Sequence, residues 1–218
     1  MVKCKEYKNA ALDALRGNWA KAVLATIILL LVSLLLEGPQ YVFKNNPVWI
    51  FAPMGVSLLF IYNIGCGAVN AFRVLVEKGD NNIIQNMFSI GFGRYFRILG
   101  GMLLVTLILF VGFLLFLIPG FILTYAYAMV PYLLVDEPDT SLVQCLTKSR
   151  LMMRGHKLDL FILHLSFLGW LILGILTLGI GMLWVAPYMY TAQGVFYLDL
   201  RRGTAGVPSE DIAAIQAE

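Results

Sequence analysis

The chain has 218 residues, of which 60% are hydrophobic and only 13% are charged. Soluble domains contain about 45–50% apolar and about 25% charged residues, so this composition excludes an ordinary water-soluble domain and indicates a membrane protein. The net charge is +3, but the basic residues are scattered along the chain, whereas a nucleic-acid-binding face would cluster them. We therefore expect the lipid bilayer, and no nucleic acid, as a partner.

Six apolar runs follow one another along the chain. A helix needs about 20 apolar residues to cross a hydrocarbon core that is ~30 Å thick. The first run is longer than the apolar part of a cleavable signal peptide, so it predicts a retained span. Together the runs predict an all-α, polytopic transmembrane helix bundle with spans at residues 20–36, 48–72, 98–118, 121–135, 158–178 and 182–198.

Proline and glycine mark the expected connections. Gly38-Pro39 and Asn45-Asn46-Pro47 predict a loop over residues 37–47, and Pro119-Gly120 predicts a sharp break between the third and fourth runs. A turn at residues 179–181 separates the last two runs. The fourth and sixth runs are short, so two re-entrant segments are an alternative to two full spans.

The basic residues decide between these alternatives. With six crossings, every Lys and Arg except Lys44 lies on one side, which the positive-inside rule assigns to the cytoplasm. Two re-entrant segments would move the four basic residues of 148–157 outside and leave eleven against five. The pattern therefore favours one membrane domain over residues 1–202, with both termini cytoplasmic and a polar tail at 203–218.

The spans read as three helical hairpins with similar plans. Before each hairpin a polar segment ends near a glycine, at Gly17, Gly93 and Gly155, and within each hairpin a glycine marks a turn, at Gly55, Gly120 and Gly181. Such units would be parallel repeats, since each contains two crossings. Any six-span protein with short outer turns would look similar, so the duplication stays open.

Short amphipathic helices are expected before the hairpins, at the cytoplasmic interface. In one, the apolar face comprises Leu142, Val143, Leu146, Ser149 and Met153, and Asp139 or Thr140 caps the start. Near the N-terminus, Tyr7, Ala11, Ala14 and Leu15 form a similar face. Such helices can meet anionic lipid headgroups or a protein partner through basic side chains, here Arg16, Lys148, Arg150, Arg154 and Lys157.

Few side chains within the spans offer chemistry. Acidic or basic groups at mid-membrane are costly and mark function, and this chain places none there except His164, with Ser166 close by. Asn63 and Asn70 flank Gly65-Cys66-Gly67, a pattern typical of tight helix packing. The polar residues that could line a cavity or join helices are Asn63, Asn70, Tyr127, His164, Ser166 and Gln193.

No catalytic, cofactor-binding or metal-binding pattern is recognisable. The three cysteines, Cys4, Cys66 and Cys145, have no metal-like spacing, and only two histidines exist. We therefore expect neither an enzyme nor a bound cofactor.

Several segments resemble a known family. They are ALRGNW at residues 14–19, IPG at 118–120, YAYAMVPY at 125–132, MRGHK at 153–157, FLGW at 167–170 and LTLGIG at 176–181. These are similar to the bacterial integral-membrane family catalogued as domain of unknown function 975. The resemblance implies a multi-pass protein of the bacterial inner membrane without an assigned activity, and it supplies no catalytic residues.

These observations favour a non-enzymatic membrane protein that binds a lipid or protein partner at its cytoplasmic face. The alternative is a small transporter or channel with a cavity lined by Asn63, Tyr127, His164 and Gln193. A membrane enzyme has less support, since only His164 and Ser166 could serve it. The sequence predicts neither a substrate nor an oligomeric state.

Overall fold

The protein is all-helical over the residues that the computed structural model describes, which are 2–42, 47–80, 82–89 and 92–204. The predicted tail beyond residue 204 and the Asn45-Asn46 pair lie outside these residues. The helices are α1 (Val2–Leu15), α2 (Trp19–Val42), α3 (Pro47–Lys78), α4 (Ile83–Phe88), α5 (Phe92–Leu115), α6 (Leu117–Ala126), α7 (Val130–Asp136), α8 (Leu142–Met152), α9 (Lys157–Leu176) and α10 (Met182–Thr204).

Three helical segments are long and apolar enough to cross a membrane, by length and composition. They are Arg94–Leu115, Leu117–Asp136 and Lys157–Leu176. The pair Cys4–Leu15 and Trp19–Leu35 passes the same test together, although its two helices meet at 97°. The described residues thus contain three candidate spans, or four if the bent pair is one span, and these helices indicate a membrane association.

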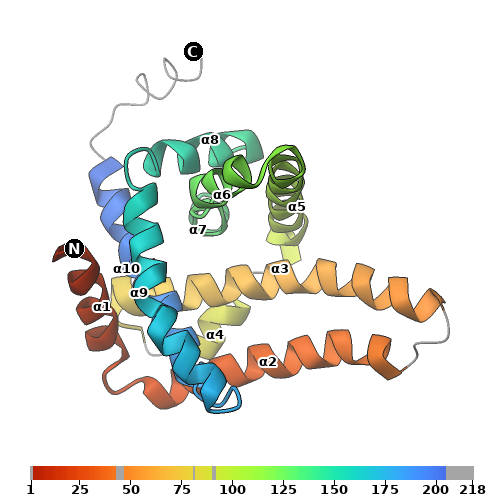
Figure 1. The fold of residues 1–218 in the computed structure, drawn as a ribbon, viewed down its shortest axis with the longest axis horizontal. Helices are drawn as coiled ribbons and strands as arrows, with labels where there is room; N and C mark the ends of the chain where they lie inside the picture. The colour runs from red at the N-terminus through yellow and green to blue at the C-terminus, as the bar shows by residue number, and fades with distance from the viewer. Residues whose placement is uncertain (1, 43–46, 81, 90–91, 205–218) are drawn as a thin grey trace.

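The helices diverge from a shared core (Figure 1). α2 and α3 lie side by side and are seen along their length, whereas α5 is seen nearly end-on. α10 contacts α1, α2, α3 and α9, so it holds the centre of the molecule. Most buried side chains come from the second half of α3, from α7 and from α10, and α1, α2, α4, α5, α8 and α9 contribute a few each. Large apolar side chains are also exposed along α2, α5, α6 and α9.

α1 packs against the core through the face expected from the sequence. Tyr7, Ala11 and Leu15 are buried, and the Tyr7 hydroxyl donates a hydrogen bond of 2.6 Å to Asp199 of α10. Burial, and next this bond, raise the pKa of Tyr7. This helix is therefore docked on the protein and does not rest on lipid alone.

Two glycines make the turns that lead into α2 and α9. Gly17 has φ +78° and Gly155 has φ +84°, a conformation that costs most other residues 1–2 kcal/mol or so. Both lie in a three- or four-residue connection between a short helix and a long one. Gly93, by contrast, is the second residue of α5.

The break predicted at Pro119-Gly120 is wrong by a few residues. The chain turns at Phe116, which is extended (φ −159°, ψ 146°), and α6 already contains Pro119 and Gly120. Proline fits there because N–H groups in the first helical turn have no intrahelical partner. A Cβ on Gly120 would lie 2.5 Å from the Phe113 ring, so this glycine allows α5 and α6 to approach closely.

Other connections also differ from expectation. α2 continues through Gly38-Pro39 to Val42, and Gly55 lies within α3 and marks no turn. The fourth predicted span is divided into α6 and α7 by a turn over residues 127–129. Pro131 lies just after this turn, in the first turn of α7. The turn before α10 lies near residues 179–181, as predicted.

Ser141 caps the start of α8, where the sequence predicted Asp139 or Thr140. Ser141 accepts a bond from the Gln144 N–H, and the Gln144 side chain accepts one from the Ser141 N–H. Such a capping box satisfies two amide groups at once, which neither Asp139 nor Thr140 does for this helix. Leu146 and Ser149 are buried as predicted, but Val143 is 67% exposed.

We predict that Gly67→Ala destabilises the protein, whereas Gly65→Ala in the same helix does not. A Cβ on Gly67 would lie 2.1 Å from the Met87 carbonyl oxygen, so α3 and α4 would have to separate, at a cost of about 1–3 kcal/mol. A Cβ on Gly65 meets nothing within 4 Å, and alanine favours the helix by up to ~1 kcal/mol. Thermal unfolding in detergent measures both; equal unfolding temperatures would contradict the close packing of α3 on α4.

Candidate functional site

A cluster of charged side chains joins the last turns of α3, α7 and α10. Its members, here called the Asp136 cluster, are Arg73, Glu77, Asp136, Tyr197 and Arg201. Asp136 has a side chain only 5% exposed and pairs with Arg73 at 2.6 Å and with Arg201 at 3.3 Å. The Tyr197 hydroxyl donates a bond of 2.6 Å to the same carboxylate.

The cluster is electrically balanced. Glu77 pairs with Arg73 at 2.9 Å and with Arg201 at 3.3 Å, so two carboxylates face two guanidinium groups. Buried charges persist in proteins only when they are paired and hydrogen-bonded, and Arg73, 12% exposed, satisfies this condition. The cluster therefore holds three helix ends together, and the paired charges leave no isolated acid or base for catalysis.

Asn70 extends this network to α4. Its carbonyl oxygen accepts a bond of 3.0 Å from Arg73, and its amide donates to the Asn86 carbonyl at 3.3 Å and to Ser89 at 3.4 Å. Asn86 in turn donates to Asp80, and this bond, with one from the Asn82 backbone, lowers the pKa of Asp80. Asn70 was predicted as a cavity or helix-contact residue, and it acts here as a helix contact.

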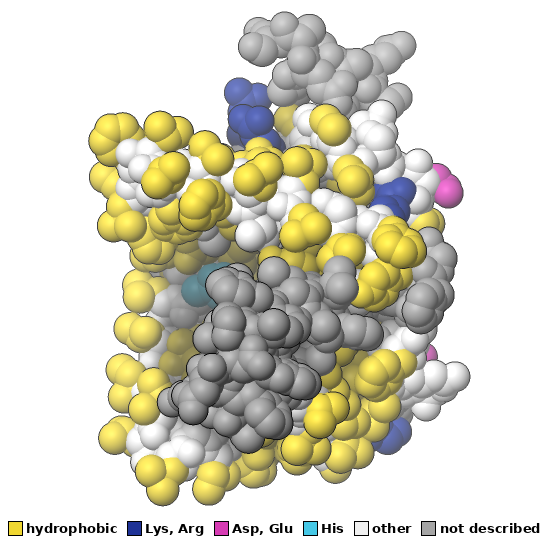
Figure 2. Space-filling model, turned by 90° about the vertical axis from the view of Figure 1, so that its right-hand side faces the viewer, with side chains coloured by type: hydrophobic (Ala, Val, Ile, Leu, Met, Phe, Trp, Pro, Cys, Tyr) yellow, Lys and Arg dark blue, Asp and Glu magenta, His cyan; other side chains and the backbone are white. Residues whose placement is uncertain are grey.

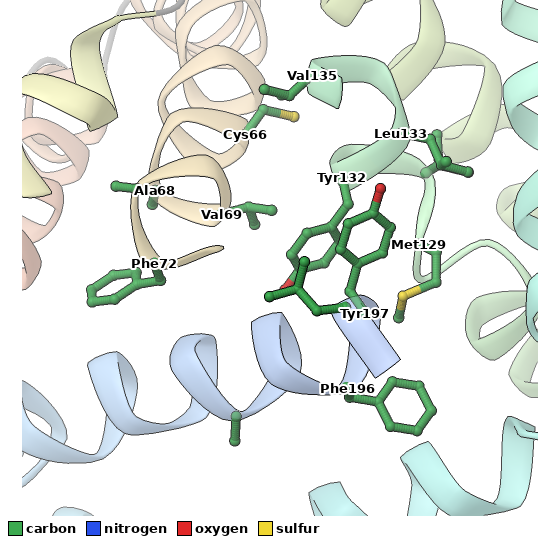
Figure 3. Packing of buried hydrophobic residues seen from close by; sticks show 14 of the residues in the cluster. Cys66, Ala68, Val69, Phe72, Met129, Tyr132, Leu133, Val135, Phe196 and Tyr197 are labelled. Carbon is green, nitrogen blue, oxygen red and sulfur yellow. The ribbon is translucent and has the colours of Figure 1, made fainter. Parts of the chain in front are cut away.

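Aromatic rings pack directly beside the cluster. Tyr132 of α7 and Tyr197 of α10 stack with centroids 4.6 Å apart and an interplanar angle of 17°. Figure 3 shows the two rings beside each other between α7 and α10, with Val69 of α3 on the side that faces them. The stack places the Tyr197 hydroxyl where it meets Asp136, so packing and charge pairing support one another.

A second arginine fixes the connection between α7 and α8. The Arg97 guanidinium donates to the carbonyl oxygens of Glu137, Pro138 and Thr140. Lys148 pairs with Glu137 across the same connection. Burial raises the pKa of the nearby Cys145 thiol, although Arg97 opposes this shift. This connection is therefore held in one conformation by side chains from two helices.

The structure brings together two of the predicted polar residues of the spans. His164 of α9 and Gln193 of α10 lie within hydrogen-bond distance, and the Tyr125 ring lies 5.8 Å from the imidazole. Ser166 faces α1 instead, where its backbone oxygen accepts from Lys8 and its hydroxyl contacts Cys4. Tyr127 is buried at the turn between α6 and α7, and Asn63 is partly buried on α3.

The predicted basic residues fall into two groups. Lys148 is ion-paired with Glu137, and Arg16, 82% exposed, lies 3.4 Å from Asp13. Arg150 and Arg154 are exposed, and Lys157 is partly exposed. Within the described residues, no group of three or more His, Cys, Asp or Glu side chains could hold a metal ion.

The Asp136 cluster was not predicted from the sequence. From the sequence, Arg73 and Arg201 only indicated the cytoplasmic side of the membrane, and Asp136 only belonged to a polar stretch. A usable signal existed, because each follows an even-numbered apolar run, and in the six-span plan all even-numbered runs end on the same side.

Comparison with known proteins places these helices in a family. A family model described as a protein of unknown function (DUF975) matches residues 94–204, just over half of the chain. The chain belongs to this family. The DUF975 match contains α6 to α10 and nearly all of α5, and with them Arg97, Asp136, His164 and Tyr197, whereas Arg73 lies outside it. No curated protein and no solved structure matches the chain.

We predict that Asp136→Asn destabilises the protein by about 3 kcal/mol, because it leaves Arg73 without its buried counter-charge. Asp13→Asn is the matched control, since the exposed Asp13–Arg16 pair contributes only about 0–1 kcal/mol. Thermal unfolding in detergent measures both variants. Equal, small losses would show that the Asp136 cluster does not hold the three helices together.

Proposed function

We propose that the chain is a multi-pass membrane protein with six spans and with both termini in the cytoplasm. The stretches 22–36, 47–72, 98–135 and 160–198 contain no Asp, Glu, Lys or Arg, and they alternate with short stretches that hold nearly all the charges. Large apolar side chains are exposed on α2, α5, α6 and α9, as lipid contact requires. Figure 2 supports this, since hydrophobic side chains cover most of the described surface in view and charged ones are few.

Three helical hairpins account for the six spans in this proposal. α2 packs on α3, α5 on α6, and α9 on α10, and the short helices α1, α4 and α8 precede these pairs. The turns at Gly17 and Gly155 have the same left-handed conformation and lead into the first and third hairpins. These similarities support a repeated unit in parallel orientation.

The topology can be tested with reporters inserted at two positions. We expect a reporter at Asp139, in the connection held by Arg97, to be cytoplasmic, and one at Pro119, near the turn between α5 and α6, to be external. The basis is the bias of Lys and Arg towards one side. A reporter at Gly179, in the turn before α10, is the matched external control. An external reporter at Asp139 would overturn the six-span topology.

At the cytoplasmic face we propose a non-enzymatic binding role in the bacterial inner membrane. The observation that supports it most directly is a pair of exposed arginines, Arg150 on α8 and Arg154 in the turn after it, next to a helix that the Ser149 hydrogen bond fixes to the core. The proposed partners are anionic lipid headgroups or a membrane or cytoplasmic protein. The balanced Asp136 cluster supports a structural use of the buried charges.

Co-purification tests this role. We expect the protein, extracted from its native membrane in mild detergent, to retain an anionic lipid or a protein, and to lose it at high salt because the contact is electrostatic. Mass spectrometry of the purified sample identifies what is bound. A sample that retains neither at low salt would contradict the binding role.

Transport is the second candidate, and the pair formed by His164 and Gln193 favours it. Polar side chains within spans mark solute pathways as well as helix contacts. Vesicles containing the purified protein would then take up a solute at a rate that Gln193→Leu abolishes. Unchanged uptake in that variant would leave the pair as a helix contact.

A further inference from the structure

We propose that the outer face of α8 binds the headgroup of an anionic phospholipid, with Arg150 and Arg154 contacting the phosphate and Val143 lying among the first acyl carbons. This inference rests on the proposed cytoplasmic binding role and assigns that role a place and an occupant. It separates Arg150 and Arg154, which would meet lipid, from Arg16 and Lys148, which pair with acidic residues of the chain.

One face of α8 is free of protein. Val143, Thr147 and Arg150 are spaced four and three residues apart, so they share a side of the helix, and the exposed Arg154 lies in the turn just after its end. The opposite side carries Cys145, Ser149 and Met152, which are buried. Val143 is exposed although it is apolar, and it lies about two helical turns before Arg150 on the same side of the helix.

The core fixes α8 in place before any ligand arrives. The Ser149 hydroxyl donates a buried bond of 2.9 Å to the Ala126 carbonyl, and the capping box orders the first turn. Arg97 holds the preceding connection. A preorganised surface loses less conformational entropy on binding, so two arginines can suffice for measurable affinity.

The two arginines of this face have no acidic partner. Residues 140–158 contain Lys148, Arg150, Arg154 and Lys157, and the nearest acidic residues in the sequence, Asp139 and Asp159, flank this stretch. Glu137 pairs with Lys148 and Asp159 with His156, whereas among the described residues neither Arg150 nor Arg154 forms an ion pair. Near α1, by contrast, Asp13 faces Arg16. The two unpaired guanidinium groups therefore give an anionic headgroup a place to bind beside α8.

Apolar side chains place the face at the edge of the bilayer. Leu158, the second residue of α9 and four residues after Arg154, is 72% exposed. Phe96, near the start of α5, is 76% exposed, and α5 contacts α8. Large exposed apolar groups beside basic ones are typical of a membrane-interface surface. A guanidinium at that level can donate two parallel bonds to one phosphate.

The test compares two double variants that remove the same charge. Arg150→Gln/Arg154→Gln alters the α8 face, and Lys5→Gln/Arg16→Gln alters two exposed residues, one within α1 and one directly after its end. Each protein is titrated with phosphatidylglycerol, and in parallel with phosphatidylcholine, in a non-ionic detergent micelle, and bound lipid is counted by native mass spectrometry. Thermal unfolding shows that both variants fold.

We expect the α8 variant to bind phosphatidylglycerol about 25-fold more weakly, about fivefold for each arginine, which corresponds to ~1 kcal/mol per basic residue near an anionic surface. The α1 variant should change by less than about twofold, and phosphatidylcholine should bind weakly to all three proteins. Inorganic phosphate should not displace the lipid, because Val143 needs an acyl chain to contact.

Other outcomes overturn the proposal and are distinguishable. Equal weakening in both variants would mean a diffuse attraction, with the broader binding role intact. Displacement by inorganic phosphate would indicate a simple phosphate site. Loss of a co-purifying protein from the α8 variant, with lipid retained, would assign the face to a protein partner. Unchanged lipid and protein retention in both variants would contradict the binding role itself.

Discussion

α7 ends inside the protein at Asp136, and the negative charge of this residue needs partners there. Arg73 of α3 and Arg201 and Tyr197 of α10 are these partners, so their contacts with Asp136 fix the positions of the three helices. A carboxylate with a 5% exposed side chain would be very costly without these partners. The Tyr132–Tyr197 stack adds apolar contact at the same place, so α3, α7 and α10 are joined by charge and by packing together.

The molecule has two kinds of surroundings, one near the Asp136 cluster and one along the helices that extend away from it. The helix ends near the Asp136 cluster carry the charges and the buried core, whereas α5, α6 and α9 expose apolar side chains over most of their length. This division is what a bilayer requires, since lipid-exposed surface needs no protein neighbour and helix ends at the interface need to pair their charges. In α8, one face lies against the core and the other is exposed.

The sequence predicted the helical class because long apolar runs have one physical solution in lipid. It predicted that polar segments end near Gly17 and Gly155, and the chain turns at both glycines with positive φ, which is a local property of glycine. It was wrong at Pro119, which begins a helix as well as it ends one, and at Asp139 or Thr140, because Ser141 forms the capping box with Gln144. It missed Asp136 and Arg73, because residues this far apart meet only through the packing of whole helices.

The same reasoning explains why five basic residues that looked alike in sequence differ in the folded protein. Arg16 has Asp13 one turn before it, and Lys148 has Glu137 across a connection that Arg97 holds in place. Each of these two charges therefore faces a carboxylate of the same chain. Arg150 lies on the side of α8 turned away from Ser149 and Met152, and Arg154 lies in the turn after the helix; among the described residues neither forms an ion pair. A positive charge left in this position is satisfied by water or by an anion, and at the edge of a bilayer the most abundant anion is a lipid phosphate.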